Sequence, residues 1–183
     1  MYRANVIEHS GIYGVHPDGS GLREVTPIDG AVDTGYEFPQ PSPDGRLLSY
    51  TTWNPTFGIH QIHVLDLITG NERLFAEEDR EDIGFATFSP DSTRIVYVKV
   101  RDGHHQVMSA PVADSTAAVA VGPNYRQVDG QYVTATFSPD GKWLIVSDPV
   151  SRETRLVDPV TGGAGELLSW STGNVSGWQR IAP

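Results

Sequence analysis

The sequence predicts an all-β protein of the β-propeller class, built from four four-stranded blades. Three observations support this: a recurring turn motif, short β-prone runs after each copy, and no helical spacing of apolar residues. The motif occurs as Ser42-Pro43-Asp44-Gly45, Ser89-Pro90-Asp91-Ser92 and Ser138-Pro139-Asp140-Gly141, with serines 47 and 49 residues apart. Because a propeller blade takes about 40–50 residues, one motif per blade fits this spacing.

The motif is a hairpin turn rather than a catalytic serine motif. Proline presets φ, aspartate bonds its own backbone, and glycine accepts a positive φ. A nucleophile elbow needs glycine two residues on either side of the serine, and no copy has this. Ser92 stands where the other copies have Gly45 and Gly141. If the three turns share one conformation, Ser92 has a strained positive φ, which a Ser92→Gly substitution would relieve. The alternative is a different middle turn that keeps φ negative and accepts serine.

Each hairpin is followed by three further strands. The second strands are the β-prone runs Leu47–Tyr50, Ile95–Val98 and Leu144–Ser147. The third strands are expected over Gln61–Leu67, Gln106–Val112 and Thr154–Val160. The fourth strands are expected over Glu72–Ala76, Ala117–Val121 and Glu166–Trp170. The turn before the fourth strand contains glycine in the first and last of these repeats and lacks it in the middle one.

The two ends of the chain together supply one more blade. Its second, third and fourth strands are expected over Ala4–Glu8, Ile12–Val15 and Leu22–Thr26. The C-terminal run Val175–Gln179 then provides its first strand. Sharing a blade between the termini closes a ring and removes exposed sheet edges. The alternative is a partial ring that closes by dimerisation.

The repeats predict a single β-propeller domain over residues 1–183. Its expected parts are blade 1 (1–30 with 174–183), blade 2 (31–78), blade 3 (79–124) and blade 4 (125–173). Phe88, Phe137 and Trp178 occupy the same position of the repeat, so we expect all three to be buried between blades. Trp178 is expected to pair its strand with Ala4–Glu8.

Composition narrows the classes of function. The net charge of −10 repels phosphate backbones, so we expect no nucleic-acid partner. The absence of cysteine excludes disulfides, thiolate nucleophiles and Cys-ligated zinc, and fits either redox compartment. No apolar run approaches the roughly 20 residues of a membrane span, and the N-terminus has no hydrophobic signal-peptide core. We expect no membrane insertion, and the choice between cytoplasm and periplasm stays open.

The repeat resembles that of TolB-like propellers, which are relatives of the WD-type repeat proteins. The resemblance rests on Ser42–Gly45, Phe88–Asp91, Phe137–Leu144 and Ile12–Leu22, where His16 replaces the acidic or Asn residue usual in the family. It implies a propeller fold, although family members usually have six or more blades. The family includes protein-binding propellers, propellers that guard peptidase active sites, and oligogalacturonate lyases, so the resemblance leaves the function open.

Aromatic residues in or near long connections are the candidate binding residues. Trp53 and Phe57 border or lie in the connection Asn54–Gly58, and Tyr125 lies in Gly122–Gly130. Aromatic side chains on exposed loops anchor protein partners, although packing beneath a loop is the other interpretation. We therefore predict a non-enzymatic binding or scaffold module for a protein or small ligand, with no cofactor and no catalytic residue.

The alternative is a metal-dependent carbohydrate-active enzyme of the lyase-like kind. Its weak candidate metal ligands are His60 and His63. On one strand their side chains point to opposite faces, so they share a metal only if His60 lies in the preceding loop. A pair of surface histidines is the simpler interpretation.

Overall fold

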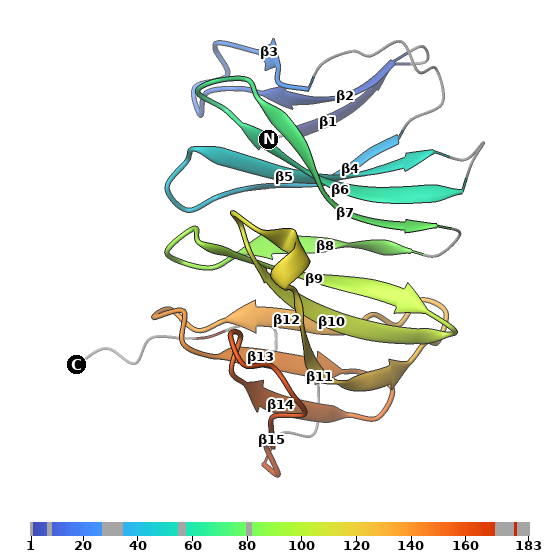
Figure 1. Ribbon diagram of the computed structural model, residues 1–183. Helices are drawn as coiled ribbons and strands as arrows, with labels where there is room; N and C mark the ends of the chain where they lie inside the picture. The colour runs from blue at the N-terminus through green and yellow to red at the C-terminus, as the bar shows by residue number, and fades with distance from the viewer. Residues whose placement is uncertain are drawn as a thin grey trace.

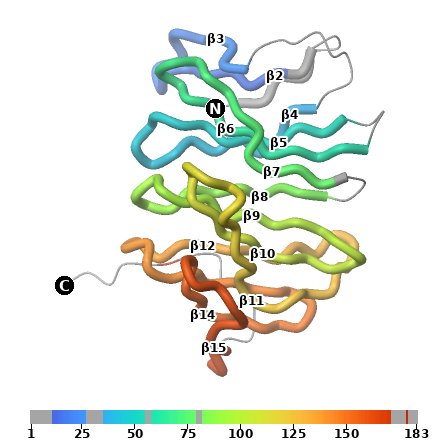
Figure 2. The backbone as a smooth tube through the Cα atoms, in the orientation of Figure 1, coloured from blue at the N-terminus to red at the C-terminus, as the bar shows by residue number. Residues whose placement is uncertain are grey.

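The computed structural model describes residues 2–6, 9–26, 35–54, 58–79, 82–170 and 178, with the side chains of 2–10 and 79 left out. These residues form four antiparallel sheets stacked in one row (Figure 1). The colour of the chain in Figure 2 runs from blue at one end of the row to red at the other, so sheets adjacent in sequence are adjacent in space. The first sheet contains β1 (Tyr2–Val6), β2 (His9–Gly14) and β3 (Arg23–Glu24).

The other three sheets each contain four strands in chain order, as the repeat predicts. The second sheet consists of β4 (Gly35–Pro41), β5 (Leu47–Asn54), β6 (Ile59–Asp66) and β7 (Glu72–Asp79). The third consists of β8 (Ile83–Phe88), β9 (Arg94–Arg101), β10 (His104–Pro111) and β11 (Val119–Arg126). The fourth consists of β12 (Thr134–Phe137), β13 (Leu144–Asp148), β14 (Glu153–Val157) and β15 (Glu166–Leu167).

Helical structure within the described residues is limited to one 3-10 turn, η1 (Ser115–Ala117). It replaces the glycine turn that the middle repeat lacks. The Asp114 carboxylate caps it by accepting a hydrogen bond from the Thr116 N–H over 3.0 Å. The fourth strand that follows, β11, starts and ends later than the expected Ala117–Val121. No helix in the described part of the chain is long and apolar enough to cross a membrane.

Each Ser-Pro-Asp turn is closed by the same hydrogen bonds. The Ser42 hydroxyl donates to Asp44 Oδ1 over 2.5 Å and accepts from the Leu47 N–H over 2.8 Å. Asp44 Oδ1 also accepts from the Arg46 N–H over 3.0 Å. The other two copies repeat these contacts, with Ser–Asp distances of 2.5 and 2.6 Å. The bond from the serine hydroxyl is the largest cause that lowers the pKa of all three turn aspartates.

The three turns share one backbone conformation, including its strained position. The φ angle is +74° at Gly45, +61° at Ser92 and +72° at Gly141, which confirms the expectation for Ser92. Ser92 is buried, and its hydroxyl accepts a hydrogen bond from the Asp44 N–H of the preceding sheet over 3.2 Å. The side chain therefore offsets backbone strain with a bond between sheets, which the sequence did not indicate.

The hydrophobic core lies between the sheets. Strand alternation sends Ile95 and Tyr97 of β9 toward the second sheet, and Val96 and Val98 toward the fourth. The cluster between the second and third sheets contains Ile62, Val64, Phe75, Ile83, Ala86, Phe88, Ile95, Tyr97 and Ala110. The cluster between the third and fourth contains Val96, Val98, Val107, Val121, Tyr125, Val133, Phe137, Leu144, Val146 and Val157. Burial of Phe88 and Phe137 is as predicted.

The row of sheets is open at both ends within the described residues. The first and last sheets lie at opposite ends of the row (Figure 1), and β1 pairs only with β2. The strand expected over Val175–Gln179 lies outside the described residues except for Trp178. The half-buried Trp178 indole donates to the Thr136 carbonyl of β12 over 3.1 Å. This contact corrects the expected placement of Trp178 beside Ala4–Glu8, because the indole binds the last sheet instead.

The Ser92 hydroxyl offsets the stability gain that glycine would bring. We expect Ser92→Gly to change the free energy of unfolding by less than about 1 kcal/mol, because relieved strain and a lost hydrogen bond are of similar size. Ser92→Ala keeps the strain and loses the bond, so we expect a destabilisation of about 1 kcal/mol. Equilibrium urea unfolding measures the free energy of unfolding of both variants. An alanine variant as stable as the parent would show that the bond to Asp44 contributes nothing.

The turn aspartates make the fold sensitive to acid. Their folded pKa values lie below the ordinary 3.8, so their stabilising contribution is present above 3.8 and is lost as the pH falls through the folded values. Asp140→Asn removes one such carboxylate, and we expect a flatter loss of unfolding free energy below pH 3.8. The control is Asp129→Asn, in an exposed turn outside the motif. Identical acid profiles for the two variants would contradict this account.

Candidate functional site

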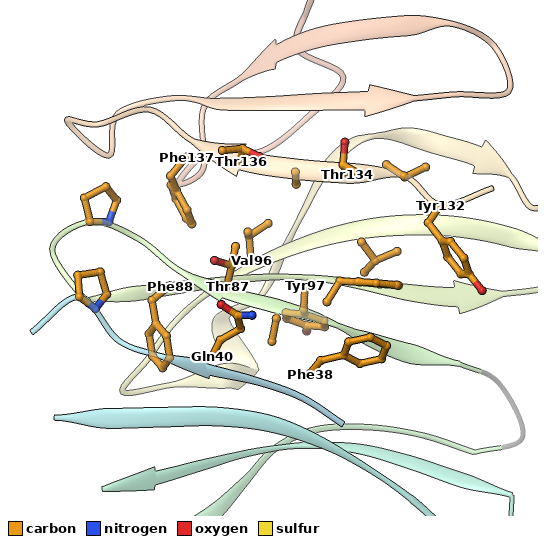
Figure 3. Close-up of a pocket in the computed structure, with 17 residues that line it drawn as sticks. Phe38, Gln40, Thr87, Phe88, Val96, Tyr97, Tyr132, Thr134, Thr136 and Phe137 are labelled. Atoms are coloured by element: carbon orange, nitrogen blue, oxygen red, sulfur yellow. The ribbon is translucent and has the colours of Figure 1, made fainter. Parts of the chain in front are cut away.

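A groove of about 710 Å³ lies among the second, third and fourth sheets. It follows their first strands, β4, β8 and β12, and Val96 and Tyr97 of β9 lie between them (Figure 3). Each first strand pairs on one side only within the described residues. Consecutive residues of β12 line the groove, so one edge of that strand faces it. The groove therefore combines apolar side chains with an unpaired strand edge.

The groove lining contains no carboxylate, imidazole, ammonium or guanidinium group among the described residues. Its polar groups are amide, hydroxyl and phenol: Gln40, Thr87, Tyr97, Tyr132, Thr134 and Thr136. Burial raises the pKa of Tyr97 to about 12, so this phenol stays neutral at ordinary pH. These side chains can bind and hydrogen-bond a ligand, but none of them is a good general acid or base near neutral pH.

Three half-exposed rings form one aromatic patch at an end of the groove. The ring centroids of Phe38 and Phe85 are 4.8 Å apart, and those of Phe85 and Tyr132 are 5.2 Å apart. Phe38, Phe85 and Tyr132 are 43%, 41% and 49% exposed, in that order. Figure 3 shows Phe38 and Tyr132 on the two walls of this end, with Phe88 and Phe137 at the other end. The patch crosses three sheets, so stacking of the sheets assembles it.

Two of the three aromatic residues sit at strained backbone positions. Phe38 has a φ of +50° and Phe85 a φ of +54°, each at a bulge where the strand register shifts. Bulky residues in this region cost about 1–3 kcal/mol, and glycine does not. The fourth sheet has no register shift between β12 and β13, and Tyr132 reaches the patch from just before β12. Exposed phenylalanines at strained bulges are hard to explain by stability alone.

The predicted anchors have three different outcomes. Trp53 is exposed near the end of β5, packs against His60 with centroids 5.9 Å apart, and lies outside the groove. Phe57 lies outside the described residues. Tyr125 is only 4% exposed, so its prediction as a surface anchor is wrong. The expected connection around Tyr125 is largely strand β11, and burial raises the pKa of the phenol above its usual value.

The two candidate metal ligands do not converge. His60 and His63 both lie on β6 with opposite parity, not in a loop and a strand. His60 Nδ1 lies 3.1 Å from Asp82, whereas His63 Nδ1 lies 2.7 Å from Glu72. Nowhere in the described chain do three or more His, Cys, Asp or Glu side chains gather to hold a metal.

Sequence reasoning missed Phe38 and Phe85 as site residues. Each stands four residues before the serine of its turn, Ser42 or Ser89. The same position of two repeats is therefore occupied by phenylalanine. This recurrence could have marked both residues as candidates for the site. The exposure of the two rings was not predictable, because it depends on the bulges. In a regular strand each ring would project from a different face.

Solved structures share this architecture at low sequence identity. TolB from Acinetobacter baumannii superposes with a TM-score of 0.66 at 18% identity over 90% of this chain and 39% of its own. The fold is a TolB-like β-propeller. A chain of the nidogen/laminin complex matches with a TM-score of 0.55 at 18% identity, over 82% of this chain and 52% of its own.

Other propellers with this fold are enzymes. Oligogalacturonate lyase in complex with manganese matches with a TM-score of 0.57 at 16% identity, over 80% of this chain and 40% of its own. The chain thus spans two fifths to about half of the length of these three structures. Neither a family model nor a curated protein matches the sequence. At these sequence identities the structural similarity defines the fold only. The function has to be inferred from the candidate site.

Backbone strain at the aromatic patch can be measured directly. Phe85→Ala removes the ring and keeps a side chain at positive φ, whereas Phe85→Gly removes both ring and strain. We expect the glycine variant to be more stable than the alanine variant by about 1 kcal/mol, the reverse of the usual order within a strand. Thr134, at the same repeat position without a bulge, provides the control, where alanine should be the more stable. If the alanine variant were the more stable at residue 85 as well, the backbone at Phe85 would not be strained.

Proposed function

We propose that this chain is a non-enzymatic binding module that holds an extended, apolar segment of a partner protein in the groove. The observation that carries the proposal is the exposed patch of Phe38, Phe85 and Tyr132, two of which are kept at strained positions. A few residues carry most of the binding energy of a protein interface, and aromatic side chains are frequent among them. Strain retained at exposed side chains is typical of functional sites.

An extended segment fits the groove better than a globular partner surface does. The lining residues Thr134 and Ala135 mean that the part of the β12 edge before Thr136 is accessible, whereas the Thr136 carbonyl already accepts the Trp178 indole N–H. An unpaired strand edge supplies main-chain N–H and C=O groups to an added extended peptide, while adjacent pockets take its side chains. The ends of the groove, with Phe38 and Tyr132 at one and Phe88 and Phe137 at the other, would receive apolar residues of that peptide.

The structural neighbours support both a binding role and an enzymatic one. One neighbour was solved as part of a nidogen/laminin complex, and another is a lyase with manganese. The binding role has the better support here because the groove lining offers apolar contacts and no ionisable acid–base group apart from tyrosine. The enzyme alternative would draw support from stoichiometric manganese or zinc in the purified protein.

A peptide-display selection tests the proposed function. We expect selection on the immobilised protein to enrich segments rich in aromatic, aliphatic or proline residues. Phe85→Gly and Tyr132→Ser should each weaken binding of a selected peptide at least about tenfold, which corresponds to about 1.4 kcal/mol. Trp53→Ser, at an equally exposed aromatic outside the groove, should leave the affinity unchanged.

Fluorescence anisotropy of a labelled peptide gives these affinities, and circular dichroism verifies that each variant is folded. Two results would contradict the proposal. One is a selection that enriches no common sequence. The other is a set of selected peptides whose affinity depends on Trp53 and not on Phe85.

A further inference from the structure

A second pocket, of about 450 Å³, lies on the third sheet and shares no lining residue with the groove. Its lining comes from β9, β10, β11 and the hairpin between β9 and β10. Basic and amide side chains supply most of its polar surface: Lys99, Arg101, His104, Gln106 and Asn124. Such a lining is unusual on a chain with 13 Lys and Arg against 23 Asp and Glu.

The basic residues stand in one row across the sheet. His104 of β10 is directly opposite Arg101 of β9 on one side and Arg126 of β11 on the other. Directly paired residues project on the same face, so the three side chains share one face. Neighbouring strands are about 4.8 Å apart, which places the two arginine Cα atoms about 10 Å from each other. Exposed like charges at this separation repel each other weakly at low ionic strength, and a bound anion would remove that repulsion.

The two arginines lack compensating charges within the described chain. No ion pair joins Arg101 or Arg126 to a described carboxylate, and both residues are exposed. Lys99, deeper in the pocket, is already paired with Glu78 at 3.1 Å. The only carboxylate of the lining belongs to Asp102 at the hairpin tip. Arg126 stands on the same face but outside the lining. Lys99, Arg101 and Arg126 together carry more positive charge than Glu78 and Asp102 carry negative charge.

A bulge in β11 opens the pocket. The register between β10 and β11 shifts between His105 and Val107, which inserts residues 122–124 and brings Asn124 into the lining. Gly122 has a φ of +79°, and a Cβ there would lie 2.8 Å from the Tyr125 hydroxyl, so a larger residue would disturb the bulge. The buried Tyr125 side chain therefore favours glycine at position 122, which keeps the bulge beside the pocket.

We propose that this pocket binds a small polyanion that carries at least two carboxylate or phosphate groups. Arg101 and Arg126 each bind one anionic group, because a guanidinium donates two parallel hydrogen bonds to either chemistry. His104 lies between them, and the amides of Gln106 and Asn124 donate to oxygens deeper in the pocket. The site is separate from the groove and does not depend on the proposed peptide binding.

Isothermal titration calorimetry tests the proposal with two probes, citrate and tripolyphosphate, at low ionic strength. We expect one-to-one binding of at least one probe, which weakens as salt is added because salt screens exposed charges. Arg101→Gln and Arg126→Gln should each reduce the affinity at least about tenfold, near the lower end of the contribution expected for hydrogen bonds to charged groups. A preference for citrate or for tripolyphosphate identifies the carboxylate or phosphate source.

The matched control is Arg46→Gln, which removes an exposed arginine of the second sheet that is paired with Asp66 at 2.8 Å. We expect this variant to bind the probe as the parent does, and all variants to melt cooperatively. Absence of saturable binding for both probes would overturn the proposal. So would an equal loss in Arg46→Gln, because the binding would then reflect general charge. Peptide affinity at the groove should stay unchanged in the arginine variants, which separates the two sites.

Discussion

Burial of apolar side chains between successive sheets is the interaction on which the rest of this structure depends. Each inner sheet has two apolar faces: Val96 and Val98 of β9 face one neighbour, and Ile95 and Tyr97 face the other. Such a sheet cannot be stable alone, because one face would always be exposed to water. Polar contacts then align the stack, as between the Arg73 guanidinium and the Val112 carbonyl. Stacking fixes which surfaces are covered and leaves the first-strand edges and outer strands accessible.

Both candidate sites follow from this division of covered and accessible surfaces. The groove forms where the first strands of three sheets come together, and the bulges at Phe38 and Phe85 turn rings outward that a regular strand would have directed elsewhere. The second pocket forms over β9, β10 and β11, where the bulge at Gly122 brings Asn124 into the lining. In each case the stacked sheets support a β-bulge, and the bulge exposes side chains that can bind a ligand.

The sequence was sufficient for the features that local physics determines. The turn motif, the order of strands within each repeat, the positive φ at Ser92 and the burial of Phe88 were all predictable, since they depend on turn chemistry and alternation. Features that depend on tertiary context were not. Tyr125 was expected in an exposed connection, but a bulge extends the strand and buries its ring. The aromatic patch and the contact of Trp178 with β12 require knowledge of which sheets are neighbours.

The central claim is that the first-strand edges and the aromatic patch together form a binding groove for an extended peptide. Hydrogen exchange of the protein with and without a display-selected peptide tests this claim most directly, because the exchange of each strand is measured separately. The account predicts slower exchange of backbone amides in β4, β8 and β12 on binding, with the outer strands β7, β11 and β15 unchanged. Protection confined to the outer strands or to the hairpin ends would contradict it.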